Sequence, residues 1–201
     1  MTVAAVQKLY VAYFNRPADT LGLNYWEGVV TAAGGSTTAV SAAFSSSAEY
    51  AATYAGMSTA ARVDAIYNNL FGRSAEPAGL TYWGGLIDSG KISISNAVTQ
   101  IAGGAQGTDL VAYNSKATAA EAFTTALNTT AEIVAYSGTA ANNAAKVWLS
   151  SIKDVATATA AVVPAVLDAS IATLTAPVVV APTSVALTTA LTPLPLPRSR
   201  L

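Results

Sequence analysis

The chain has 201 residues, a net charge of −1 and only 10% charged residues, against roughly 25% in ordinary soluble domains. It contains no cysteine and no histidine, which excludes disulfides, thiolate metal sites, cysteine nucleophiles and any Ser-His-Asp triad. No basic cluster is available to hold phosphates, so nucleic acid is not expected as a partner. A net charge near zero favours self-association.

The first segment has the periodicity of a helix. Its apolar residues follow the spacing i, i+3, i+4, i+7, i+8 of one helical face: Val6, Leu9, Tyr10, Tyr13 and Phe14. Thr2 is suited to cap this helix, and Pro17 disfavours helical geometry at the preceding residue, so the helix should end near Asn15. Asp19 or Thr20 then caps a second helix, whose apolar residues are Leu23, Trp26, Val29 and Val30.

The same pattern returns 57 residues later. Residues 6–30 and 63–87 match without gaps at ten of twenty-five positions, where chance gives about two. The identical pairs are Val6/Val63, Tyr10/Tyr67, Phe14/Phe71, Arg16/Arg73, Ala18/Ala75, Gly22/Gly79, Leu23/Leu80, Tyr25/Tyr82, Trp26/Trp83 and Gly28/Gly85. A fixed period of this kind indicates a duplicated structural unit.

Each unit extends past the matched stretch. A glycine-containing turn at 34–35 precedes a third helix over about 37–44, and Ser47 is a plausible cap for a short fourth one. Phe44 and Ile101 keep the same offset, and Ser58 opens the second copy. The predicted units are therefore 1–57 and 58–113.

The remainder of the chain is not periodic. Residues 114–175 are rich in alanine and predict helices over 118–128, 139–151 and 157–174, with Pro164 kinking or splitting the last and Val147 and Trp148 as apolar anchors. From Ala176 the chain mixes β-branched residues with five prolines, which predicts an extended tail over 176–201. Such a tail either packs on something, often a neighbouring subunit, or is a disordered linker. The predicted fold is all-α, ending in this tail.

Six residues of the repeat are candidates for contact with a glycan or another subunit: Arg16, Asp19, Tyr25, Arg73, Glu76 and Tyr82. The arginines could bind an anionic sugar, or each could lock its own turn against the acid three residues on, which we favour. The tyrosines could stack on sugar rings, whereas the neighbouring tryptophans are expected in the core.

No catalytic constellation accompanies these residues, so no catalytic residue and no enzyme activity are predicted. One carboxylate per turn makes a poor calcium site, so no cofactor or metal is expected, although calcium shared between subunits is left open. No stretch of about eighteen apolar residues is present to span a membrane, and the N-terminus lacks the features of a cleaved secretory signal.

The repeated pattern Leu-Tyr-x-x-x-Phe-x-Arg-x-Ala-[Asp/Glu]-x-x-Gly-Leu-x-Tyr-Trp resembles an uncharacterised helical repeat of secreted bacterial proteins, similar to the helical domain of phycobilisome linkers. The first copy fits from Leu9 to Trp26, and the second has Ile66 in place of the leucine. Residues 44–50, FSSSAEY, also look like the closing motif of that family.

The resemblance covers residues 1–110 and implies a cell-surface or extracellular protein of a Gram-negative bacterium. Relatives include S-layer, haemolysin-type and adhesin proteins that leave the cell by type I secretion. It implies a non-enzymatic, self-assembling S-layer-like or filament subunit, forming homopolymers. The alternative is a lipopolysaccharide-binding or glycan-binding anchor, and a third possibility is an intracellular linker-type scaffold. The chain lacks the calcium-binding β-rich region of large S-layer proteins, so their lattice is not expected here.

Overall fold

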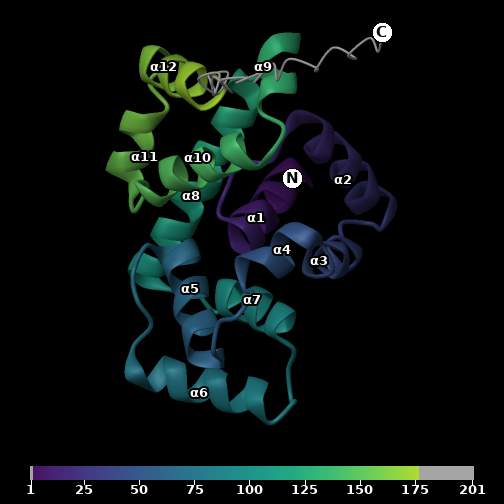
Figure 1. Cartoon of the computed structure of the whole chain (residues 1–201), viewed down its shortest axis with the longest axis vertical. Coiled ribbons are helices and arrows are strands. Elements are labelled where there is room, and N and C mark those ends of the chain that lie inside the picture. The colour runs from purple at the N-terminus through teal and green to yellow at the C-terminus, as the bar shows by residue number, and fades with distance from the viewer. Residues whose placement is uncertain (1, 177–201) are drawn as a thin grey trace, which may run out of the picture.

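The structure is a computed structural model that describes residues 2–176. Within this range the chain forms twelve α-helices and no strand, which confirms the all-α prediction (Figure 1). The predicted extended tail lies outside the described residues, apart from Ala176.

The first eight helices repeat one arrangement twice. The first unit contains α1 (Thr2–Phe14), α2 (Thr20–Ala32), α3 (Thr38–Ser45) and α4 (Ala48–Thr53). The second contains α5 (Thr59–Phe71), α6 (Pro77–Asp88), α7 (Ile94–Gly103) and the start of α8 (Gly107–Ala126). Helices α1 and α5 have the same length and begin 57 residues apart, as do the starts of α2 and α6. The duplication seen in the sequence is therefore a duplication of structure.

Side chains at helix starts explain several of the boundaries. Asp19, Ser47 and Ser58 accept hydrogen bonds from the backbone N–H of Gly22, Tyr50 and Ala61 and so cap α2, α4 and α5. Thr2, expected to cap α1, is instead helical, and its hydroxyl donates to Glu27 Oε1 at 2.7 Å.

Four helices follow α8 and form the alanine-rich part together with its remainder: α9 (Thr130–Ala135), α10 (Thr139–Ser150), α11 (Val155–Ala161) and α12 (Pro164–Leu174). Three predictions need correction here. Helix α8 begins at Gly107 rather than near 118 and runs unbroken across residue 113. The short α9 was not predicted, although Thr129 and Glu132 form a capping box. Pro164 splits the last predicted helix, as expected, but the first part begins at Val155.

One hydrophobic core joins the two units. It contains buried residues from α1 to α5 and from α7, α8 and α10, and a smaller cluster forms around Phe123, Tyr136 and Ile171. Trp148 packs against both clusters, whereas Val147, predicted as an anchor, is 74% exposed. Figure 1 shows α1 at the centre of the chain, with the α5–α6 pair at one end and α12 at the other.

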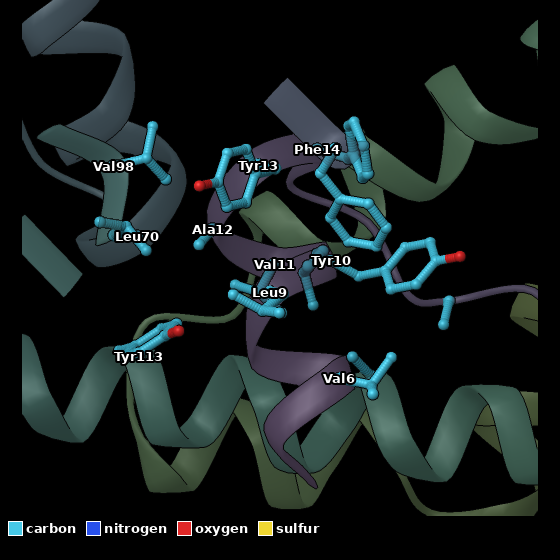
Figure 2. Packing of buried hydrophobic residues seen from close by; sticks show 14 of the residues in the cluster. Val6, Leu9, Tyr10, Val11, Ala12, Tyr13, Phe14, Leu70, Val98 and Tyr113 are labelled. Carbon is cyan, nitrogen blue, oxygen red and sulfur yellow. The ribbon is translucent and has the colours of Figure 1, made fainter. Parts of the chain in front are cut away.

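Helix α1 is enclosed on almost every side. Residues 9–14 are buried without interruption, and Figure 2 shows their side chains pointing in several directions, with Leu70, Val98 and Tyr113 of the second unit beside them. In the equivalent α5 only one face is buried, at Val63, Ile66, Leu70 and Phe71. The copies differ because α1 packs against α2, α3, α4, α5, α7 and α8, whereas α5 packs against α1, α6, α7 and α8.

Candidate functional site

Arg16 closes the turn between α1 and α2 from a buried position. Its Nε and Nη2 donate to the two carboxylate oxygens of Glu49, at 2.9 and 2.8 Å. Its Nη1 donates to the carbonyl of Pro17 at 3.1 Å and lies 3.9 Å from Asp19 Oδ2. The guanidinium also lies over the ring of Tyr10, 5.2 Å from its centroid. Only 7% of Arg16 is exposed, so its donors serve the fold rather than a ligand.

Arg73 repeats this arrangement in the second unit. Its Nε and Nη2 donate to the carboxylate of Asp109 at 2.8 and 2.6 Å, and Nη1 donates to the carbonyl of Ser74 at 3.0 Å. The predicted partner Glu76 is also engaged, with its Oε1 2.7 Å from Nη1. The guanidinium lies 5.3 Å from the centroid of the Tyr67 ring. Unlike Arg16, this side chain is 36% exposed.

Both pairs hold their charged forms. Burial acts to lower the pKa of Arg16, but the hydrogen bonds and charge of Glu49 outweigh it and raise that pKa. Burial acts to raise the pKa of Glu49, and Arg16, with Lys146 at 3.4 Å, holds it below its usual value. The hydrogen bond to Asp109 raises the pKa of Arg73. Each arginine is thus a permanent cation paired within the chain.

The carboxylates that hold the arginines were not predicted. Glu49 lies in the first turn of α4 and Asp109 in the first turn of α8, each more than thirty residues from its arginine. The period of 57 does not align them, because the second unit is three residues longer at this point. The signal that could have found them is an acidic residue shortly after a helix start, as in Glu49 two residues after the cap Ser47.

A second repeated bond fixes the chain between the first two helices of each unit. Gln7 Oε1 accepts from the backbone N–H of Ala18 at 3.1 Å, and Asp64 Oδ1 accepts from that of Ala75 at 2.9 Å. Gln7 and Asp64 occupy equivalent positions and accept equivalent hydrogen bonds with different side chains. Because the two residues are not identical, the comparison of the two copies could not predict this hydrogen bond.

The glycine of each motif makes room for a tyrosine hydroxyl. A Cβ at Gly22 would overlap the hydroxyl of Tyr10, and one at Gly79 would lie 3.0 Å from that of Tyr67. Trp83 Nε1 donates to the same Tyr67 hydroxyl at 3.2 Å. These motif residues therefore contribute to the packing within each unit.

Tyr25 and Tyr82 are different, because they face solvent. They are 63% and 61% exposed, and each stands edge-on to its neighbouring tryptophan, with ring centroids 4.7 Å apart for Trp26 and 5.0 Å for Trp83. The tryptophans were expected in the core and are half-buried against it. The tyrosines are the members of the predicted site that present a flat apolar face outward.

Lys116 forms a buried centre that sequence reasoning missed. Its Nζ donates to the carbonyls of Asn69 and Asn68 at 2.5 and 3.4 Å and to Asn15 Oδ1 at 3.4 Å. Asn68 and Asn69 lie in the last turn of α5, and Asn15 follows α1, so one ammonium joins the C-terminal ends of the two equivalent helices, where a cation is favoured. Burial, with the charge of Lys153 nearby, lowers the pKa of Lys116 to about 8.

No metal-binding cluster accompanies these residues in the described part of the chain. Between residues 2 and 176, no three Asp or Glu side chains gather closely enough to hold a metal ion. No single helix between residues 2 and 176 is long and apolar enough to cross a membrane. Helices α11 and α12 meet the requirements of length and composition only when taken together, and the pair is bent by 74°.

The last four helices carry several exposed apolar side chains. Five valines of α9 to α12 and the connection before α12 are between 46% and 74% exposed: Val134, Val147, Val155, Val163 and Val166. From Val155 to Ala176 the only charged residue is Asp168. The surface formed by residues 155–176 therefore has little charge that would oppose association with another apolar surface.

Taken together, the geometry defines a duplicated helical domain whose motif residues are mostly used internally. Two overlapping segments, residues 4–54 and 41–106, match the family described as a domain of unknown function, DUF4214, and together span just over half of the chain. The chain therefore belongs to this family, an uncharacterised helical repeat domain. No curated protein and no solved structure matches the chain.

Proposed function

We propose that the chain is a structural, self-assembling extracellular protein, an S-layer-like or filament subunit on the surface of a Gram-negative bacterium. The observation that carries the proposal is the set of exposed valines on α9 to α12, together with the scarcity of charge from Val155 to Ala176. Apolar surfaces of this kind mark sites of association, and a net charge of −1 offers little repulsion between copies.

The use of the motif residues supports a structural role. Both arginines hold carboxylates of their own chain. Gly22 and Gly79 make room for tyrosine hydroxyls, and the half-buried tryptophans pack against the core. A protein whose repeated polar groups stabilise its own turns is suited to serve as a rigid building block. The location rests on the family resemblance described above.

The test is electron microscopy of the purified chain at moderate concentration, together with sedimentation velocity. We expect fibres or sheets from the full chain and soluble monomers after deletion of residues 176–201. Unchanged assembly after the deletion would refute a role of the tail, and a full chain that stays monomeric at every concentration would refute the assembly.

A second function, a lipopolysaccharide-binding or glycan-binding anchor, is favoured by Tyr25 and Tyr82. Both present an exposed ring at equivalent places of the two units, and aromatic faces are suited to stack on sugars. A monomeric chain that co-precipitates with lipopolysaccharide, and loses this binding when both tyrosines are changed to alanine, would support the anchor. Retention of binding by the double variant would remove the tyrosines from that function.

A further inference from the structure

An open apolar groove lies between α10 and α12. Its volume is about 810 Å³, and it is lined by Val147 and Trp148 of α10 and by Val166, Ala169 and Leu174 of α12. The floor is fixed, because Trp148 packs on the ring of Phe123 with centroids 5.0 Å apart. The two valines at its sides are 74% and 48% exposed. Covering apolar surface that is left open in this way is favourable, in proportion to the area removed from water.

The chemistry of the groove fits the chain that follows it. Residues 177–201 carry apolar residues such as Val178–Val180, Val185 and Leu187 and have no acidic residue; their only charges are Arg198 and Arg200. A groove without charge suits an occupant whose apolar part is also without charge. Fully extended, 25 residues reach at most about 85 Å, whereas the eleven residues of α12 are about 16 Å long.

The end of α12 argues against the chain filling its own groove. Leu174 lies at the end of the groove, so a tail that entered at once would have to reverse direction within a few residues. The capping residue Thr175 has φ −99°, which is not the left-handed conformation that turns a chain back at a helix end. Pro177 favours extended backbone at Ala176, and no glycine follows in 177–201.

We propose that the groove between α10 and α12 receives residues 177–201 of a second copy of the chain. This inference rests on the proposed self-assembly and identifies its acceptor site. Each copy then offers one groove and one tail, so the contact is head-to-tail and continues from copy to copy as an open chain unless a ring closes.

The absence of cysteine allows a direct test by cross-linking. The variant with Val147→Cys and Leu187→Cys is prepared once with ¹⁵N and once without, and the two preparations are mixed unfolded, refolded together and oxidised. Mass spectrometry then identifies the disulfide-linked peptides. We expect links between residues 147 and 187 that join labelled to unlabelled chains in the proportion of random pairing. The control variant carries Val134→Cys, at an exposed valine outside the groove, in place of Val147→Cys, and keeps Leu187→Cys. It should give far fewer links.

Three outcomes would overturn the proposal. Links that join only chains of the same isotope would place the tail in its own groove. Equal linking in the Val134 control would make the contact unspecific. Filaments seen by electron microscopy without any link between 147 and 187 would refute the groove as acceptor while leaving assembly in place.

A second measurement blocks the groove without touching the core. The full chain with Val147→Arg and Val166→Arg is compared with one carrying Val134→Arg and Val163→Arg, which adds the same charge at valines of similar exposure outside the groove. Sedimentation velocity should show monomers for the first and wild-type assemblies for the second. Assembly of both would refute the groove, whereas a wild-type chain that is itself monomeric would refute the proposed function.

Discussion

Arg16 and Arg73 make the same bonds in different surroundings. Both donate two hydrogen bonds to a carboxylate of a later helix, and the guanidinium of each lies over a tyrosine ring. Arg16 is 7% exposed, while the Arg73 side chain is 36% exposed. Water and salt therefore screen the second pair far more than the first.

Replacing each arginine by alanine measures this difference. Arg16→Ala leaves the Glu49 carboxylate partly buried and without its main partner, which should cost about 3 kcal/mol of unfolding free energy. Arg73→Ala should cost about 1 kcal/mol, because the more exposed Arg73 side chain gives up less on removal. Urea denaturation at pH 7 compares the two. Equal losses would show that the environment of the pair does not decide its strength.

Lys116 links stability to pH. Because burial lowers its pKa to about 8, the unfolded chain holds this proton between about pH 8 and the ordinary lysine value near 10.4, while the folded chain does not. The free energy of unfolding should therefore rise with pH from about 8. The buried hydroxyls of Tyr10, Tyr54 and Tyr136 act oppositely, because burial raises their pKa values, so stability should fall again above about pH 10.

Urea midpoints measured between pH 7 and 9.5 test the lysine. The wild-type midpoint should rise over this range, reflecting an increase in the free energy of unfolding of at most about 1.4 kcal/mol per pH unit. Lys116→Met should flatten the rise, whereas Lys91→Met, at an exposed lysine, should leave it unchanged. A rise that survives Lys116→Met would assign the titration to another group.

At the scale of the helix, α2 contains two glycines with opposite requirements. Gly22 faces the hydroxyl of Tyr10 and the carboxylate of Asp19, while nothing lies within 4 Å of a Cβ at Gly28. Alanine is favoured over glycine inside a helix by up to about 1 kcal/mol. The close contact at Gly22 should outweigh that preference, because the tyrosine ring is rigid and buried.

Thermal unfolding of Gly22→Ala and Gly28→Ala tests this assignment. We expect the first to lower the melting temperature and the second to raise it by a few degrees. Removing the hydroxyl in the double variant with Tyr10→Phe should recover part of the loss at Gly22. No recovery would mean that the tyrosine is not the cause of the loss.

The helices of the repeat were predictable because their signals are local. The apolar spacing from Val6 to Phe14, the caps at Asp19 and Ser58 and the break at Pro17 each act within a few residues. The difference between α1 and α5 is only partly visible: Val11 and Ala12 of the buried helix correspond to Asn68 and Asn69 of the peripheral one. Which copy is enclosed depends on packing against α8, and no local pattern records that.

The candidate site was predictable to a smaller extent. The arginine turns and the outward tyrosines follow from the repeat itself. Glu49, Asp109 and Lys116 are joined to their partners across 33 to 101 residues, a separation over which spacing carries no information. Val147 was misplaced because α10 exposes that side of the helix to form the groove.

Across the whole molecule, the two units share one core. The main cluster includes Phe14 and Phe44 of the first unit together with Leu70 and Ile101 of the second, and α8 packs against both α1 and α5. Neither unit is therefore complete without the other. The backbone repeats in two units, whereas the hydrophobic core is not divided between them.

Calorimetry tests the unity of this core in the chain lacking residues 176–201, where assembly should not interfere. We expect one transition, with a calorimetric enthalpy equal to the van't Hoff enthalpy. Two transitions, with Leu70→Ala lowering only one of them, would show that the units unfold independently.

The enclosure of α1 has a consequence for synthesis of the protein on the ribosome. Its buried side chains find their cover in α8, through contacts such as that of Gln7 with Thr124, 117 residues later. At 5 to 20 residues per second, roughly 6 to 20 s pass before that cover is made. During this time the apolar side chains that α1 will bury remain uncovered on the nascent chain, which makes α1 a segment that a chaperone has reason to hold.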